Sequence, residues 1–132
     1  MKKCFWVCLA LAGVLLGCSD EDHKLEGKWQ MQRMEVNGEV LPVDTVYYNF
    51  QNSLFMYQIA NSINSNMQAY GYKQTDDGDK LALEIDVNQI DMAYFYEKSG
   101  WTEPLRVFTI DKLSGSKLIL SDNGRKYYFR KF

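Results

Sequence analysis

Short segments of alternating apolar and polar residues, separated by tight turns, constrain the fold of this chain most. In residues 80–87 an aliphatic side chain occupies every second position, and charged side chains occupy three of the four positions between. This period of two is typical of a β-strand with one buried face. Asn-Gly pairs at 37–38 and 123–124 are favoured in two-residue hairpin turns. Because tight turns join antiparallel neighbours, the sequence predicts strands that meander in chain order.

Eight such strands are expected after residue 25. They cover residues 29–36, 45–50, 54–59, 67–73, 80–87, 105–112, 117–121 and 125–132. Residues 40–43 contain Pro42 and are interpreted as an irregular edge, since proline cannot donate to a β-ladder. Residues 61–66 are polar and are predicted to form a loop. Eight meandering strands close naturally into a barrel without exposed edges, so the predicted fold is all-β: an eight-stranded antiparallel up-and-down barrel.

Residues 88–104 admit two interpretations. Bulky side chains at 90, 94 and 101 have helical spacing, with Asn88 as an N-cap and Gly100 as a stop. Positions 90, 92, 94 and 96 also alternate, as in a strand. We favour one short helix near residues 88–100, acting as a lid or plug. Tyr94, Tyr96 and Trp101 are then candidate ligand-facing residues at the barrel mouth, and packing in the core is the alternative for these aromatic side chains.

The first eighteen residues indicate where in the cell the protein is located. A basic start, Met1-Lys2-Lys3, precedes the uncharged residues 4–16, a run shorter than the roughly 20 residues of a membrane-spanning helix. Leu15-Leu16-Gly17-Cys18 then resembles the lipobox of bacterial lipoproteins. This resemblance implies cleavage before Cys18 and attachment of lipid to its sulfur. The chain is thus expected to comprise a signal peptide (1–17), a lipidated acidic linker (18–24) and a barrel domain (25–132).

The acidic segment Ser19-Asp20-Glu21-Asp22 follows the cysteine directly. It resembles the surface-export signal of lipoproteins in Bacteroidetes-type Gram-negative bacteria, and a solvated tether is the alternative interpretation. The resemblance implies an outer-membrane lipoprotein that is exposed on the cell surface and is held at the membrane by its N-terminal lipid.

The first strand also carries a family resemblance. Gly27-Lys28-Trp29 resembles the Gly-x-Trp motif of lipocalins and their calycin relatives, and residues 43–50, 108–120 and 127–132 are similar to small lipocalin-like lipoproteins of unknown function. The resemblance implies that Trp29 closes one end of the barrel and that a basic residue of a late strand crosses its face. Arg130 is the first candidate for this residue and Arg125 the second. It also implies a tendency to hold small apolar molecules.

The sequence offers no catalytic or metal-binding constellation. Its one histidine, His23, lies in the linker, and its three cysteines lie within the first eighteen residues. A zinc site or a Ser-His-Asp arrangement therefore cannot be assembled. The net charge of −2 gives no basic field for nucleic acid. We expect no enzyme, cofactor or metal site. We expect instead a binding module for a small apolar ligand or, alternatively, an accessory or inhibitor protein with a filled barrel and a protein partner.

The lipobox interpretation predicts the fate of a Cys18→Ser variant. Without the sulfur no lipid can be attached, so the protein should move from the membrane fraction to the soluble fraction after detergent-free lysis. Immunoblotting of the two fractions measures this shift. A variant that still sediments with membranes would show that Cys18 is not the anchor.

Overall fold

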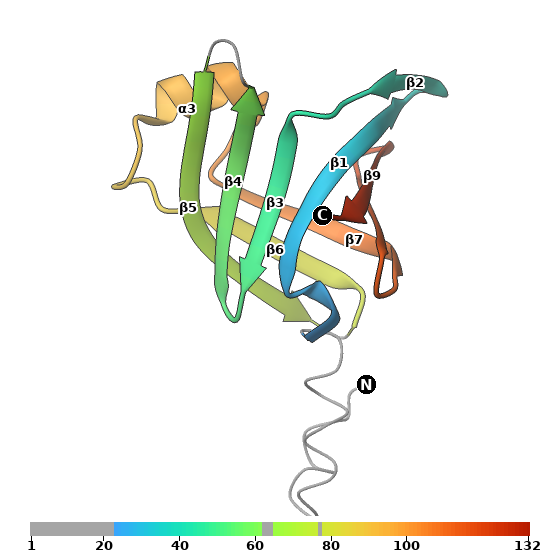
Figure 1. Cartoon of the computed structure of the whole chain (residues 1–132). Helices are drawn as coiled ribbons and strands as arrows, with labels where there is room; N and C mark the ends of the chain where they lie inside the picture. The colour runs from blue at the N-terminus through green and yellow to red at the C-terminus, as the bar shows by residue number, and fades with distance from the viewer. Residues whose placement is uncertain (1–22, 62–64, 77) are drawn as a thin grey trace, which may run out of the picture.

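The computed structural model describes residues 23–61, 65–76 and 78–132. Within them the chain forms a nine-stranded sheet and the helix α3. Figure 1 shows how these elements are arranged. In chain order the elements are β1 (Gly27–Val36), β2 (Glu39–Pro42), β3 (Val46–Gln51), β4 (Leu54–Asn61), β5 (Ser65–Asp76), β6 (Lys80–Ile85), α3 (Met92–Ser99), β7 (Leu105–Leu113), β8 (Lys117–Asp122) and β9 (Arg125–Lys131).

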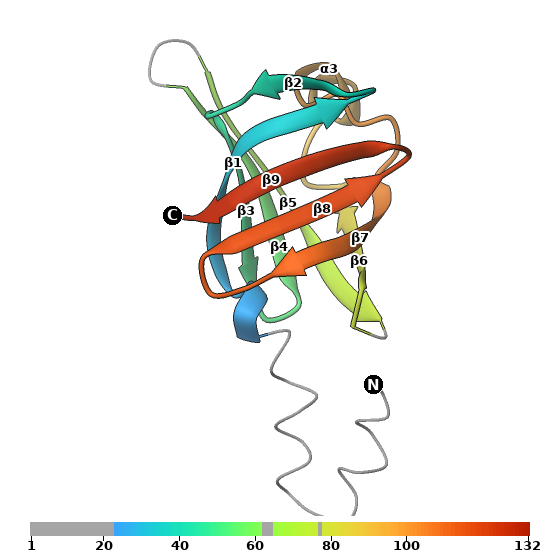
Figure 2. The ribbon, with the colours of Figure 1, turned by 90° about the vertical axis from the view of Figure 1, so that its right-hand side faces the viewer.

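The first and last barrel strands pair with each other and close the sheet. β1 and β9 are antiparallel, from Trp29 opposite Lys131 to Val36 opposite Arg125. Figure 2 shows β1, β9, β8 and β7 one beside the next. Strand β1 together with β3 to β9 therefore forms a closed antiparallel barrel of eight strands, and this confirms the predicted fold class.

The ninth strand corrects one expectation. Residues 39–42 are not irregular but form β2, which pairs regularly with β1. Pro42 is the last residue of β2, which pairs with β1 alone and so leaves one side of its ladder unpaired. A proline is tolerated at such an edge because its missing N–H leaves no donor unsatisfied.

Two hairpin turns have the conformation that their sequences predict. Asn37 and Gly38 have φ of 55° and 82°, and Asn123 and Gly124 have φ of 48° and 79°. Positive φ at both central residues defines the turn type whose twist matches that of the flanking strands. The second turn joins β8 to β9 and so fixes the register between these two strands. In this way it also helps to position β9 against β1.

A β-bulge interrupts the regular pairing of β1 with β9. The pairing with β9 shifts between Met31, opposite Phe129, and Arg33, opposite Tyr128. The extra residue restores an inward position at Met34, which lies opposite the buried Tyr127. Bulges of this kind bend a strand and re-aim its side chains. Here the bulge adds a second methionine to the upper wall of the barrel interior.

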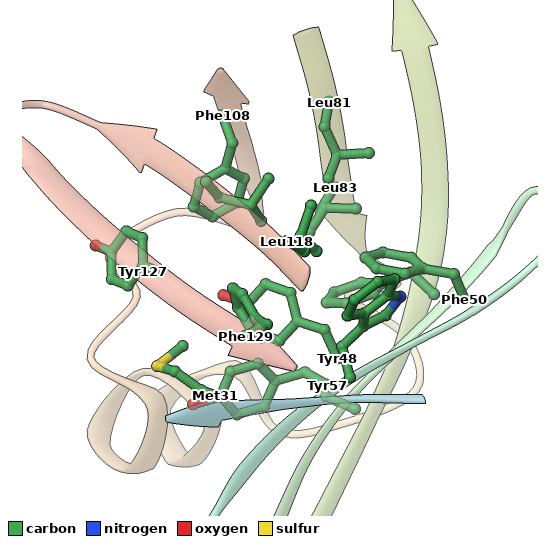
Figure 3. Close-up of a cluster of buried hydrophobic side chains, with 14 of the residues drawn as sticks. Met31, Tyr48, Phe50, Tyr57, Leu81, Leu83, Phe108, Leu118, Tyr127 and Phe129 are labelled. Carbon is green, nitrogen blue, oxygen red and sulfur yellow. The ribbon is translucent and has the colours of Figure 1, made fainter. Parts of the chain in front are cut away.

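Aromatic side chains fill the lower and central parts of the barrel. The ring of Tyr48 lies 4.8 Å from that of Phe129 and 5.2 Å from that of Phe55 (centroid distances), and both are tilted or edge-on contacts. Figure 3 shows this cluster, with Phe50 at one side and Met31 and Tyr127 at the other. Edge-on packing of this kind adds to the free energy gained from apolar burial.

The segment between β6 and β7 contains the expected helix with a later start. The side chain of Asp91, not Asn88, caps α3 by accepting a hydrogen bond from the Ala93 N–H at 3.1 Å. Gly100 ends the helix with φ of 81°, as predicted. Val87 was expected on the buried face of its strand, but it lies beyond the end of β6 and is 51% exposed. None of the helices in the described residues is long and apolar enough to span a membrane.

The closed end of the barrel is built around Trp29, which is fully buried. Its indole N–H donates to the carbonyl oxygen of Leu25 at 2.8 Å, so the helical residues 23–25 are held across this end. The cation over the indole ring is the ammonium of Lys131, 4.5 Å from the ring centroid. Gly27 has φ of +116°, and a β-carbon there would lie 3.1 Å from the Lys131 ammonium nitrogen. Glycine is therefore required two residues before the tryptophan.

The residue over Trp29 thus differs from the expected Arg130. Side chains alternate along β9: Tyr127 and Phe129 are buried in the barrel, so Lys131 is the next residue on that face. Arg130 points outward and donates to the side chain of Gln30 at 3.2 Å. Arg125, the second candidate, lies at the opposite end of β9 beside Asp122.

Truncation of Trp29 should test the closed end. We expect Trp29→Ala to lower the free energy of unfolding by about 3–5 kcal/mol, because a large buried side chain leaves a cavity. Arg130→Ala, a change on the outer face of the paired strand, should stay within about 0.5 kcal/mol of the parent. Urea denaturation measures both. A Trp29→Ala loss below about 1 kcal/mol would contradict the role of Trp29 as the plug of this end.

Candidate ligand pocket at the barrel mouth

A cavity of about 290 Å³ remains in the barrel at the end opposite Trp29. Inward-facing residues of β1, β3, β4, β7 and β9 surround it, together with residues 98–101, which form the end of α3 and the two positions after it. Its volume lies at the lower end of the range of small-molecule pockets, about 300–1,000 Å³. The aromatic cluster forms its floor, since Tyr48 and Tyr57 belong to both.

One wall of the pocket is apolar. It consists of Met31 and Met34 of β1 together with Val43, which follows β2, and Val46, the first residue of β3. The unbranched methionine side chains are flexible and polarizable, so they can adapt to ligands of different outline. This wall offers apolar surface without any charged group.

Tyrosine hydroxyls add polar groups to the lining of the pocket. Burial raises the pKa of Tyr48 and of Tyr57, and the positive charge of Arg106 only partly opposes this effect. Burial raises the pKa of Tyr127 as well, again against the effect of Arg106. All three phenols therefore stay neutral at physiological pH, and each can donate or accept a hydrogen bond.

Arg106, Asp122 and Tyr127 form a partly buried polar network beside the pocket. The Arg106 guanidinium donates to Asp122 Oδ2 from Nη2 at 2.7 Å and from Nε at 3.2 Å. The same Nη2 donates to the Tyr127 hydroxyl at 3.0 Å, and that hydroxyl donates to Asp122 Oδ1 at 3.2 Å. The Arg106 and Asp122 side chains are only 15% and 10% exposed. A network in which each member has a partner is rigid in a low-dielectric site.

Aromatic rings hold the guanidinium in place. Arg106 lies 4.4 Å from the ring centroid of Phe108 and 4.9 Å from that of Trp101. Although burial lowers the pKa of Arg106, its neighbours, above all Tyr48 and Asp122, outweigh this effect and raise the pKa above its usual value. The side chain is therefore a permanent cation in the pocket wall.

The three candidate residues of the 88–104 segment lie in different environments. Trp101 is buried and lines the pocket. Tyr94 is 37% exposed, with the Lys98 ammonium 5.8 Å from its ring, and Tyr96 is half-buried against the core. The helical residue that enters the core is Phe95, whose ring lies 5.3 Å from that of Trp101. Neither Tyr94 nor Tyr96 lines the pocket.

The sequence analysis did not identify the residues of this polar network as candidates, although one pattern in the sequence could have indicated them. Arg106 and Phe108 occupy alternate positions of the predicted strand 105–112, so they share a face. A charged residue on an inward face is uncommon and needs a buried partner. The partner, Asp122, lies between the predicted strands 117–121 and 125–132, where a turn is expected. Within the described residues no cluster of histidine, cysteine and acidic side chains is arranged to hold a metal ion.

Trp101→Ala and Tyr94→Ala should separate buried from exposed residues of this segment. Loss of the buried indole should lower Tm by about 10 °C or more, since such truncations cost about 3–5 kcal/mol. Loss of the exposed phenol should change Tm by no more than a few degrees, on the order of 2 °C. Differential scanning calorimetry measures both. If Trp101→Ala changed Tm as little as Tyr94→Ala is expected to, Trp101 would not support the core.

Comparison with known proteins identifies the family. The family model for a lipocalin-like domain matches residues 13–132. A lipocalin-like protein from Bacteroides uniformis is similar with 28% identity and a TM-score of 0.75, over 83% of this chain and 99% of the other. An uncharacterized protein from Bacteroides eggerthii has 28% identity and a TM-score of 0.71, over 82% and 99%.

A more distant structure shares the fold. Japanin from Rhipicephalus appendiculatus, bound to cholesterol, has 11% identity and a TM-score of 0.53, over 80% of this chain and 74% of the other. Among curated proteins no sequence matched this chain. The barrel order, the buried tryptophan and the family match over residues 13–132 agree, and the chain belongs to the lipocalin-like domain family.

Proposed function

We propose that this protein binds a small molecule with a substantial apolar part in the pocket at the barrel mouth. The observation that carries the proposal is the cavity of about 290 Å³, whose lining combines apolar side chains with the neutral hydroxyls of buried tyrosines. Apolar surface with a few convergent polar groups is the usual composition of ligand sites. The proposal is for a binding protein and not for an enzyme.

The size of the pocket narrows the choice of ligand. Japanin is bound to cholesterol in its structure, so a protein of this fold is able to bind a lipid. In the present chain the aromatic cluster fills the lower and central barrel, and the cavity that remains is at the small end of ligand pockets. This favours a molecule smaller than a sterol.

We also propose that the protein is a lipoprotein of the outer membrane, exposed at the cell surface and anchored through lipid on Cys18. The support is the lipobox and the acidic segment after it, both of which lie outside the described residues. Residues 23–25 lead into the barrel at its closed end, opposite α3 (Figure 1). An anchor attached there would direct the pocket away from the membrane.

A second candidate function is contact with a protein partner. On the outer face, Leu54, Tyr72 and Leu105 are each about half exposed, at 52%, 51% and 48%. The strand register sets them in one row across β4 to β7, with Glu84 between Tyr72 and Leu105. An exposed apolar surface of this kind is typical of interaction sites. A barrel that holds no small molecule would favour this function.

Binding of the neutral fluorescent probe N-phenylnaphthylamine tests the primary proposal. The parent protein should enhance its fluorescence saturably. Val46→Trp should abolish the enhancement, because the indole would occupy the pocket, whereas Val107→Trp on the outer face should not. Circular dichroism verifies that both variants are folded.

Native mass spectrometry of the purified protein complements the titration by detecting any small molecule that is retained. If the folded parent binds no probe and retains no small molecule, the pocket does not serve as a binding site and the protein-contact function gains support. If Val107→Trp also abolishes the enhancement, the probe binds outside the barrel.

A further inference from the structure

The pocket carries an excess of positive charge. Among the described residues that line it, Lys98, Arg106 and Arg125 are basic, and no lining residue is acidic. This contrasts with the whole chain, whose net charge is −2. The basic residues come from separate parts of the chain, namely the end of α3, β7 and β9. The barrel therefore gathers cations at one place on a weakly acidic protein.

The neighbouring carboxylate compensates only part of this charge. Asp122 lies 2.7 Å from Nη2 of Arg106 and 3.5 Å from Nη2 of Arg125, so two guanidinium groups share it. One positive charge of this cluster is left over, and Lys98 adds another at the rim. Charge that is partly withdrawn from water without a counter-charge destabilises the protein. A negative group in the pocket would relieve this imbalance.

Hydrogen-bond donors with no acceptor lie at the same place. Nε of Arg125 is buried and has no hydrogen-bond partner among the described residues. Arg106 donates to described residues from Nε and Nη2, which leaves the donors of Nη1 for a ligand. A guanidinium carries five N–H donors in a plane, a geometry that matches the two oxygens of a carboxylate.

We propose that the ligand of this pocket is a small amphipathic anion, a medium-chain aliphatic carboxylate in chemical class. Its carboxylate would accept hydrogen bonds from Arg106 and Arg125, and its hydrocarbon chain would lie against Met31, Met34 and Val46. The inference rests on the proposed function, because it names the chemistry of the molecule that the same pocket holds. It adds a charge requirement that an apolar cavity alone does not impose.

The test compares three probes with the same alkyl chain and different head groups: octanoate, octanol and octylamine. Each displaces N-phenylnaphthylamine from the parent protein below its micellar concentration. Octanoate should bind about tenfold more tightly than octanol, and octylamine should bind more weakly than octanol, because the pocket attracts anions and repels cations. The preference for octanoate should decrease as salt is added.

Matched variants assign the preference to residues. Arg125→Gln should lower the affinity for octanoate about tenfold and leave that for octanol unchanged. Arg130→Gln, which removes the same charge from the outer face of the same strand, should change neither. Arg125 is chosen because its side chain is more exposed than that of Arg106, 39% against 15%. Its loss leaves the buried Arg106–Asp122 pair intact.

The outcomes separate the two proposals. If octanol binds as tightly as octanoate, or if Arg125→Gln affects both probes equally, the anion proposal is overturned while the pocket remains a binding site. If N-phenylnaphthylamine and all three alkyl probes fail to bind the folded protein, the proposed function itself fails.

Discussion

The pairing of β1 with β9 is the interaction on which the rest of the structure depends. It joins residues about a hundred positions apart, such as Trp29 and Lys131. Without it β9 would present an unpaired edge of N–H and C=O groups, and the interior would be open to water along one side. Closure also defines an inside and an outside for every strand. Its entropic cost is high, because the chain must be ordered between two distant segments.

The register of that pairing decides which side chains can form the two ends of the barrel. Lys131 faces Trp29 and Arg125 faces the pocket because both lie on the inward face of β9, which alternates with a period of two. Arg130, one position away, is directed outward to Gln30. A shift of one residue would exchange these faces. The tight turn at Asn123 and Gly124 therefore helps to position both the closed end and the mouth.

The sequence predicted the features that follow from local periodicity and turn chemistry. The eight barrel strands, the Asn-Gly turns and the stop of α3 at Gly100 are of this kind, and the structure confirms them. It did not predict the bulge between Met31 and Arg33, because a bulge depends on the partner strand. For the same reason it missed the pairing of Arg106 with Asp122, which needs the register between strands. Trp101 was identified, but its neighbours Tyr94 and Tyr96 lie outside the pocket.

The two ends of the barrel differ because they bury their cations differently. At the closed end Lys131 lies on the indole of Trp29 and donates to the backbone carbonyl of Glu26, so its charge is accommodated among fixed groups. At the mouth two guanidinium groups share Asp122, and Arg125 Nε has no acceptor in the described chain. Complete apolar packing there would bury these groups without compensation, which would destabilise the fold. The pocket can therefore remain open at the mouth while the interior below it is packed with aromatic side chains.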